Sequence, residues 1–242
     1  MDIKTDGIVL RIIKYNDRSH IVDLYSQELG RCAVLVNISK STKSKLKSNL
    51  FQPLSILDLN LSKTNKSSLY RLKDVKLSYT FQSIPFHPVK SALAFYIAEF
   101  LYYAVRDENI NKPLFDYLDH SMRWLDSCEV GYANFHLVFL IRLSRFLGLY
   151  PNYSDYHRGD YFDLLNACFC SSQPLHPRFL KGDESVFILK LMRMNYDSMH
   201  LFKFSRHDRA RILHILNDFY KIHIPNFPDL KSLDVLKELF ED

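Results

Sequence analysis

The chain has 242 residues, 47% of them hydrophobic and 24% charged, so it is long enough for one large or two small soluble domains with a full core. Six glycines are too few for folds rich in glycine turns or phosphate-binding glycine loops, and four scattered cysteines do not indicate a disulfide framework. The formal charge of +5 is uneven, because residues 1–82 hold 14 Lys and Arg against 7 Asp and Glu, whereas the rest hold 18 against 20. A basic first third indicates a polyanionic partner.

The N-terminal residues carry charges throughout and lack the apolar stretch of a signal peptide. The most apolar window, residues 92–105, is interrupted by Glu99 and is too short to span a membrane. We therefore expect a cytoplasmic protein with no membrane partner.

Residues 1–82 read as a β-domain. Alternating apolar residues separated by turn residues predict five strands without helical periodicity. Five strands in about 80 residues favour an antiparallel barrel of the OB type, with an SH3-like barrel as the nearest alternative. The predicted strands are 6–17, 20–26, 31–38, 52–61 and 67–81.

A lysine-rich segment, residues 37–51, separates the third and fourth predicted strands. Lysines recur there among serine, threonine and asparagine, with no acidic residue. So polar a segment cannot bury an apolar face, which predicts a loop suited to phosphate backbones. A solvated loop without a ligand is the alternative. The lysines are Lys40, Lys43, Lys45 and Lys47.

OB barrels bind nucleic acids with cationic side chains for the phosphates and aromatic side chains for the bases. Tyr15, Tyr25 and Tyr70 are candidate stacking platforms, although each also suits the edge of a core. We expect binding without sequence readout. The candidate phosphate-binding residues are Arg11, Lys14, Arg18, Arg31, Lys40, Lys43, Lys45, Lys47, Arg71 and Lys73.

Pro85 and Pro88 mark a change to helical periodicity, so the predicted domains are 1–82 and an all-helical domain, 83–242. The fold class is therefore α+β. Ser205 is a plausible N-cap, Gly148 is a helix stop, and residues 150–184 are irregular and unassigned. The predicted helices are 89–106, 112–125, 132–147, one following Ser205, and 231–240.

Catalytic and metal-binding patterns are weak in this sequence. The motifs G-x-S-x-G, G-x-x-x-x-G-K-[ST], G-x-G-x-x-G and H-E-x-x-H do not occur. The acidic residues of the basic segment are scattered, unlike those of a metal-dependent nuclease. Cys168 and Cys170, with His157 and His176 on either side, lack zinc-knuckle spacing and are expected to be buried structural cysteines. We expect no enzyme, no metal and no cofactor.

Arg142 and Arg145 lie three residues apart in a strongly apolar helix. The plain expectation is that they snorkel or pair with an acid. The functional alternative is an apolar groove whose arginines hold an acidic, hydrophobic peptide tail.

The order of these parts resembles the bacterial RecO family of DNA repair proteins over nearly the whole chain. The resemblance implies an OB domain joined to a helical domain in a recombination mediator. Such proteins bind single- and double-stranded DNA, anneal complementary strands and, with RecR, help to load RecA on strands coated by single-strand-binding protein, whose acidic C-terminal tail the helical domain takes up. The segments that carry the resemblance are GIVLRIIKYNDRSHIVDLYSQELGR, KSTKSKLK, QPLSILDLNL, AFYIAEFLY, FLGLYPN and LKSLDVLKELF.

The chain departs from that family in one respect. Many members carry a four-cysteine zinc site after the third helix, but this chain has Asp155 and Arg158 where the first pair is expected and only Cys168 and Cys170 beyond them. We therefore expect no zinc. The alternative function is an RNA-binding OB module with a helical protein-docking adaptor, which the same charges would serve.

Overall fold

The computed structural model describes residues 2–17, 19–37, 48–63, 68–154 and 156–241. Contacts between Cα atoms divide the chain into two compact units. The first comprises Met1–Ser127 with Leu230–Leu239, and the second comprises Cys128–Asp229 with Phe240–Asp242. The predicted domain boundary after residue 82 stays a prediction.

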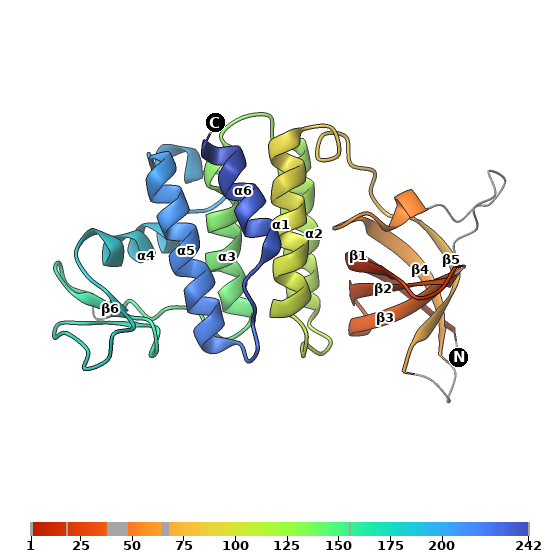
Figure 1. The fold of residues 1–242 in the computed structure, drawn as a ribbon, viewed down its shortest axis with the longest axis horizontal. Helices are drawn as coiled ribbons and strands as arrows, with labels where there is room; N and C mark the ends of the chain where they lie inside the picture. Colours follow the sequence, from red (N-terminus) through yellow and green to blue (C-terminus); the bar gives the residue numbers. More distant parts are fainter. Residues whose placement is uncertain (1, 18, 38–47, 64–67, 155, 242) are drawn as a thin grey trace. The chain divides into compact units, whose positions relative to one another are not determined.

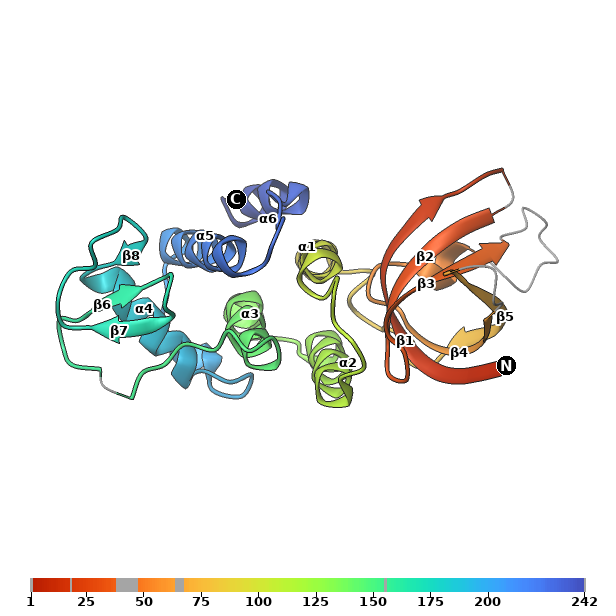
Figure 2. The same cartoon turned by 90° about the horizontal axis from the view of Figure 1, so that it is seen from below.

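The first unit contains a closed barrel of five strands in the order β1-β2-β3-β5-β4 (Figure 1, Figure 2). β3 and β5 pair in parallel, and the other neighbouring strands pair antiparallel. This arrangement confirms the predicted OB-type barrel rather than the SH3-like alternative. The strands are β1 (Asp2–Lys14), β2 (Ser19–Ser26), β3 (Gly30–Asn37), β4 (Ile56–Lys63) and β5 (Tyr70–Leu77).

Strand β1 is long because two neighbours share it. Residues 2–8 pair with β4 and residues 7–14 pair with β2, with a bulge between Val9 and Arg11 that bends the strand. Gly7 lies in the overlap, where a Cβ atom would be 2.8 Å from Leu59 Cδ1 inside the barrel. Because β1 coils around the barrel, both of its ends lie on the same side of it (Figure 2).

The barrel core follows from alternation along the strands. On β3, Cys32, Val34 and Val36 point inward and are buried, whereas Ala33 and Leu35 are half-buried on the outer face. Burial raises the pKa of Cys32 to about 12, so its thiol stays protonated and unreactive.

The fourth strand begins later than the sequence predicts, at Ile56 rather than residue 52. Ser48–Phe51 form a 3-10 helix, and Leu54 has a φ of 65°. The Leu54 side chain is fully buried and its N–H donates to the Val9 carbonyl at 2.7 Å. These tertiary contacts hold a left-handed conformation that a leucine rarely adopts.

One end of the barrel packs against the segment between helices α1 (Pro88–Ala104) and α2 (Lys112–Ser127). The Tyr25 hydroxyl donates to the Asn109 carbonyl, and the Arg31 N–H donates to the Glu108 carbonyl, both at 3.1 Å. Gly30 has a φ of +64°, and a Cβ there would lie 2.5 Å from the Asn109 carbonyl carbon. Only glycine fits this approach. We call this group of five residues the junction end.

The chain between β5 and α1 is hydrogen-bonded to the end of α2. The Asp126 carboxylate accepts the backbone N–H groups of Gln82, Ser83 and Ile84 at 2.9, 2.8 and 2.9 Å. Burial alone would raise the pKa of Asp126, but these N–H groups outweigh burial and hold the pKa below its ordinary value. Lys90, itself buried, donates to the Asp126 carbonyl at 3.1 Å.

Helix α6 (Lys231–Glu241) begins in the first unit. The Glu99 carboxylate accepts the N–H groups of Lys231 and Ser232 at 3.2 and 2.8 Å. The acid that interrupts the apolar window of α1 therefore caps another helix. Among the residues that the structure describes, no helix is long and apolar enough to cross a lipid bilayer.

The second unit is mainly helical. The predicted Ser205 cap is confirmed, since Ser205 and Asp208 form a reciprocal capping box. Gly148 follows α3 with a φ of 69°, as expected of a helix stop. Helix α4 was not predicted. The helices are η2 (Tyr132–Asn134), α3 (Phe135–Phe146), α4 (Asp183–Arg193), η3 (Met199–Leu201) and α5 (Arg206–His223).

The segment 150–184, unassigned from the sequence, contains a small antiparallel sheet in the order β7-β6-β8 (Figure 2). Its strands are β6 (Tyr161–Asp163), β7 (Cys168–Cys170) and β8 (Phe179–Leu180). The Phe162 and Phe169 rings pack edge to face at 5.0 Å, and this contact lies at the centre of the sheet. The second unit thus adds a small sheet to the predicted helices.

Candidate nucleic-acid interface

Strand ends gather on the side of the barrel that faces away from the junction end (Figure 2). Lys14 pairs with His20, Ser19 with Asn37, and Lys63 with Tyr70. β1 and β3 end on this side, β2 begins on it, and β4 ends on it where β5 begins. We call this the open end.

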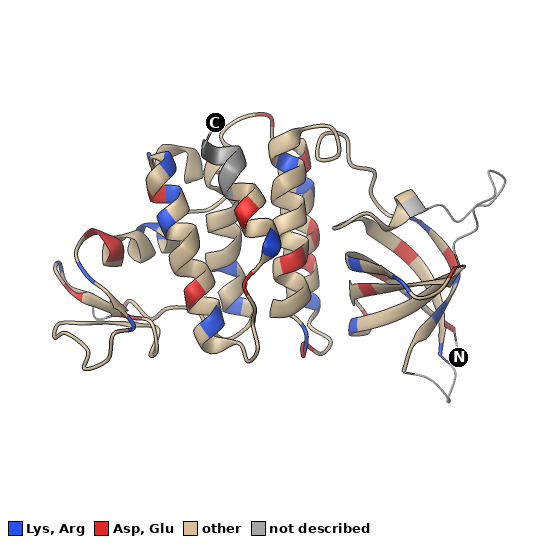
Figure 3. Ribbon diagram, viewed as in Figure 1, with Lys and Arg blue, Asp and Glu red and all other residues tan. Residues whose placement is uncertain are grey.

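Basic side chains are exposed around the open end, and Figure 3 marks the charged residues on the strands. Lys14 lies 2.8 Å from Asp17, and Lys73 lies 2.6 Å from Asp2, both as exposed ion pairs. Such pairs are worth at most about 1 kcal/mol, so a phosphate can compete for either lysine. Arg71 is exposed on β5.

Half of the predicted phosphate-binding residues cannot be located on the structure. They lie outside the described residues, and their role stays a prediction. They are Arg18, Lys40, Lys43, Lys45 and Lys47.

Two predicted residues lie on the α1 side of the barrel instead. The guanidinium carbons of Arg11 and Arg31 are 4.9 and 4.7 Å from the centre of the Tyr102 ring on α1. Arg31 also lies 3.3 Å from Asp23, and its side chain is only 12% exposed. Burial lowers the pKa of Arg31, an effect that Asp23 opposes. Arg31 therefore joins barrel and helix, and Arg11, which is exposed, is the more accessible of the two.

The three candidate stacking tyrosines differ in exposure. Tyr15 is 63% exposed beside the open end. Tyr70 is half-buried against the core, with the Lys63 ammonium 5.2 Å from its ring centre. Tyr25 is fully buried at the junction end, so its interpretation as a stacking platform is wrong. Tyr25 alternates with the inward-facing Val22 and Leu24 on β2, so it lies on the outer face of the strand. It is nevertheless buried, because the segment after α1 covers it.

Lys63 was not among the predicted site residues. The sequence Lys63-Thr64-Asn65-Lys66 reads as turn chemistry, which drew attention to the turn and not to the charge. Strand pairing puts Lys63 at the open end with Lys14 and Arg71. The signal that could have found it is its position as the last residue of a strand leading into a basic turn.

In the second unit, Arg142 and Arg145 have partners of their own. Arg142 donates through Nε and Nη2 to the Met194 carbonyl at the end of α4, at 3.1 and 2.6 Å. Arg145 is exposed, donates to the Tyr150 hydroxyl at 2.7 Å and lies 4.2 Å from that ring centre. Arg142 thus stabilises the fold, and Arg145 is the one with an exposed guanidinium.

The cysteines of β7 are half-buried and not fully buried as expected. Burial raises the pKa values of Cys168 and Cys170. Near them, His176 Nε2 lies 3.3 Å from the Asp163 carboxylate. Within the described residues, no group of three or more histidine, cysteine or acidic side chains is arranged to hold a metal ion. Asp155 lies outside those residues.

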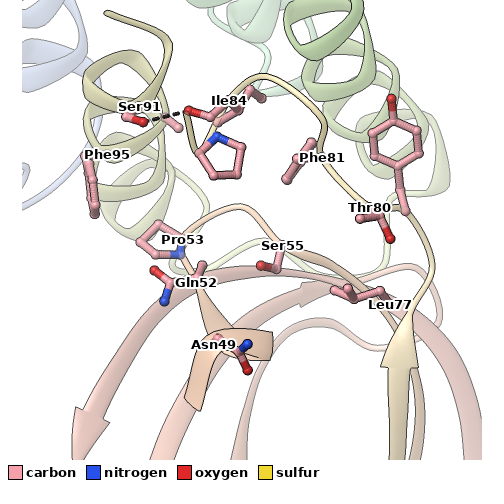
Figure 4. A pocket seen from close by; sticks show the side chains of 13 residues that line it. Asn49, Gln52, Pro53, Ser55, Leu77, Thr80, Phe81, Ile84, Ser91 and Phe95 are labelled. Atoms are coloured by element: carbon pink, nitrogen blue, oxygen red, sulfur yellow. Dashed lines mark hydrogen bonds between the residues drawn. The ribbon is translucent and has the colours of Figure 1, made fainter. Parts of the chain in front are cut away.

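A pocket of about 290 Å³ lies within the first unit, where the segment before β4 meets the linker and α1 (Figure 4). Phe81, Ile84 and Phe95 line it, and the Ser91 hydroxyl donates to the Ile84 carbonyl at 2.6 Å. Among the described residues that line this pocket, none is basic. The described lining of the pocket therefore carries no charged side chain.

Two family models match the chain. "Recombination protein O N terminal" matches residues 1–81, and "Recombination protein O C terminal" matches residues 85–234. The chain is 55% identical over 239 residues to a DNA repair protein RecO from Bacteroides fragilis, which covers 98% of this chain and 99% of the relative. It is 56% identical over 237 residues to that of Phocaeicola vulgatus, covering 98% of both. It is 34% identical over 248 residues to that of Porphyromonas gingivalis, covering all of both chains.

Proposed function

The chain belongs to the RecO family of DNA repair proteins, and from that premise we propose that it is a non-catalytic recombination mediator. It binds single- and double-stranded DNA, promotes annealing and, with RecR, helps to load RecA on strands coated by single-strand-binding protein. The observation that carries the proposal is the open end, where Lys14, Lys63 and Arg71 lie at or near the ends of their strands.

Phosphate contacts are the main source of affinity in such a protein, because each neutralised phosphate releases counterions. The relatives are named for DNA repair, which favours DNA over the RNA alternative. Arg31 is left out of the proposed contacts because it is only 12% exposed and is engaged by Asp23. The residues that we propose to contact phosphates are the others predicted from the sequence together with Lys63: Arg11, Lys14, Arg18, Lys40, Lys43, Lys45, Lys47, Lys63, Arg71 and Lys73.

Annealing by this surface needs no active site. Two DNA strands repel each other through their phosphates, and a cationic surface that binds both lowers that repulsion. Base pairing then supplies the free energy. We therefore propose that residues 1–82 bind DNA and that residues 83–242 dock proteins.

The lysine-rich segment gives the first test. In a variant with Lys40, Lys43, Lys45 and Lys47 changed to alanine, the slope of log K against log salt for duplex DNA should fall by about 3–4. The matched control removes the same charge from the second unit, through alanine at Lys181, Lys190, Lys203 and Lys221. If the salt slope falls equally in both variants, the effect is due to net charge alone. If the slope is unchanged in the lysine-segment variant, that segment does not contact the DNA.

For protein docking, we propose that the surface near Arg142 and Arg145 takes the acidic C-terminal tail of single-strand-binding protein. Arg145→Ala is the cleaner variant, because Arg142 stabilises α4. The tail peptide should bind the variant about tenfold more weakly, as expected for the loss of a charged contact. The matched control is Arg158→Ala, which removes an exposed arginine of the same unit. Unchanged peptide affinity in Arg145→Ala would exclude this docking surface.

A further inference from the structure

The small sheet of β6, β7 and β8 has two different faces. Residues that pair across neighbouring strands share a face, and Phe162 pairs with both Phe169 and Leu180. All three side chains are buried, so this face is apolar. The opposite face carries Asp163 and its pairing partner Cys168. Asp163 is only 6% exposed, and a buried carboxylate needs hydrogen-bond partners.

Four donor groups surround the Asp163 carboxylate. Its Oδ1 accepts the backbone N–H groups of Leu165 and Asn166 at 2.8 and 3.1 Å, and its Oδ2 accepts the Asn166 side-chain amide at 2.7 Å. His176 Nε2 lies 3.3 Å from the same Oδ2. His176 Nδ1 accepts the Arg178 N–H at 3.2 Å, so Nε2 carries the hydrogen of the imidazole and donates to Asp163. We call Asp163, Leu165, Asn166 and His176 the Asp163 cluster.

The Asp163 cluster joins parts of the chain that a structural metal ion joins in other small folds. Leu165 and Asn166 lie in the turn between β6 and β7, and His176 lies between β7 and β8. Asp163 is the last residue of β6, the central strand of the sheet. In structural zinc sites, cysteine and histidine ligands from separate turns meet at one ion. Here the turns meet at one carboxylate.

The cysteines of this sheet do not provide a zinc site with the described residues around them. Cys168 and Cys170 are two residues apart on β7 and share one face of the strand. Burial raises the pKa of both thiols, and the Asp163 carboxylate raises it further, whereas a metal ligand has to be a thiolate. Asp163 is itself engaged by the donors of its cluster. The four-cysteine zinc site of many family members therefore does not fit the described residues of this sheet.

We propose that the Asp163 cluster takes the structural role that a zinc ion has in those family members, so that the small sheet is held together without a metal. The apolar face supplies hydrophobic burial, and the cluster fixes the turns through hydrogen bonds to a charged group. Next to Asp163, the Leu164 carbonyl lies 2.8 Å from His223 Nε2 on α5. The cluster thus also fixes where the sheet meets α5. This inference does not depend on DNA binding.

The first test uses the wild-type protein, untagged and purified after growth with added zinc. Metal analysis should find far less than one zinc ion per chain, and a strong chelator should leave the midpoint of chemical denaturation unchanged. A midpoint that falls in the chelator would overturn the proposal. Bound zinc whose removal leaves the midpoint unchanged would support it, because such zinc does not hold the sheet together.

The second test measures amide hydrogen exchange over residues 161–180 in full-length Asp163→Ala. Removing the carboxylate leaves its donors without their acceptor, so this segment should exchange at least about tenfold faster than in the wild-type protein. The matched control is Asp197→Ala, which removes an exposed acid of the same unit and should leave exchange in the segment unchanged. Equal exchange in the two variants would overturn the proposal.

A third variant tests the thiols directly. The double variant Cys168→Ser and Cys170→Ser should change exchange over residues 161–180 by less than about twofold, because the thiols do not hold the turns. Faster exchange in this variant than in Asp163→Ala would show that the cysteines hold the sheet, and would overturn the proposal. Should Asp163→Ala fail to fold, Asp163→Asn replaces it, since asparagine keeps the shape and one oxygen acceptor. Its exchange should still be faster than that of the cysteine variant.

Discussion

The two ends of the barrel are built from the same strands but use their polar groups differently. At the junction end, Tyr25 and Arg31 contact the chain after α1, and Arg31 is engaged by Asp23 and Tyr102. At the open end, Lys14 and Arg71 are exposed, and Lys14 and Asp17 form a solvent-exposed pair. Polar groups at the first end stabilise the fold, whereas those at the second remain accessible to a ligand.

The comparison would be contradicted if a substitution at the junction end changed DNA binding, or if one at the open end changed stability. Four variants or conditions test it, in order of their expected effect on the free energy of unfolding.

The largest effect is expected for Asp126→Ala. It removes the acceptor for three backbone N–H groups of the linker and leaves them without that partner. Chemical denaturation should show a loss of about 2–4 kcal/mol. Asp119→Ala, which removes a half-exposed pair with Arg123 on the same helix, is the control and should cost less than about 1 kcal/mol. If Asp126→Ala and Asp119→Ala lose the same free energy of unfolding, the hydrogen bonds to the linker do not contribute to stability.

A smaller loss is expected for Tyr25→Phe at the junction end. This change deletes only the hydroxyl that donates to the Asn109 carbonyl. The free energy of unfolding should fall by about 1 kcal/mol, with the salt slope of DNA binding unchanged. Tyr15→Phe at the open end is the control and should leave stability unaltered. A changed slope in Tyr25→Phe would mean that the junction end takes part in DNA binding.

A third effect appears only in acid. The folded-state pKa of Asp126 lies below its ordinary value of 3.8, so its contribution to stability is fully present above that value and is lost as the pH falls through the folded-state pKa. Between about pH 5 and pH 2, the free energy of unfolding measured by chemical denaturation should therefore fall more steeply in the wild-type protein than in Asp126→Asn. If the free energy of unfolding falls equally with pH in both proteins, other carboxylates account for the loss of stability in acid.

The smallest effect on stability is expected at the open end, for Arg71→Ala. Its guanidinium is exposed, so the free energy of unfolding should change by less than about 0.5 kcal/mol. The duplex salt slope should fall by about 0.9, and Arg71→Lys should restore it because the charge is kept. An intact slope in Arg71→Ala would exclude this residue from the phosphate contacts.

Much of the fold follows from local patterns. Alternation along β3 and the Ser205 cap were readable because each depends on neighbours in sequence. The parallel pairing of β3 with β5 was not, since it joins Val34 to Tyr70 across two intervening elements. The left-handed Leu54 was also unreadable, because burial and a bond to Val9 hold it there.

The candidate site divides in the same way. Counting lysines and arginines identified a basic barrel, but the count could not show that Arg31 is largely buried and Arg71 is exposed. That distinction depends on Tyr102, a residue about seventy positions after Arg31 that packs over its guanidinium. Tyr25 and Tyr15 likewise look alike in sequence and differ only because the Asn109 segment covers one of them. The charge of a segment can be counted from its sequence, whereas the exposure of each side chain depends on tertiary contacts.

The close approach at Gly30 has a consequence for recombining parts of related proteins. A Cβ atom there would collide with the main chain of Asn109, so the hairpin of β2 and β3 and residues 107–111 have complementary shapes. A chimera that takes its barrel from one relative and its helices from another would have to transplant residues 107–111 along with the barrel. A fragment cut at residue 81 would leave the Arg31 N–H and the Tyr25 hydroxyl facing water in place of the carbonyls that normally receive them.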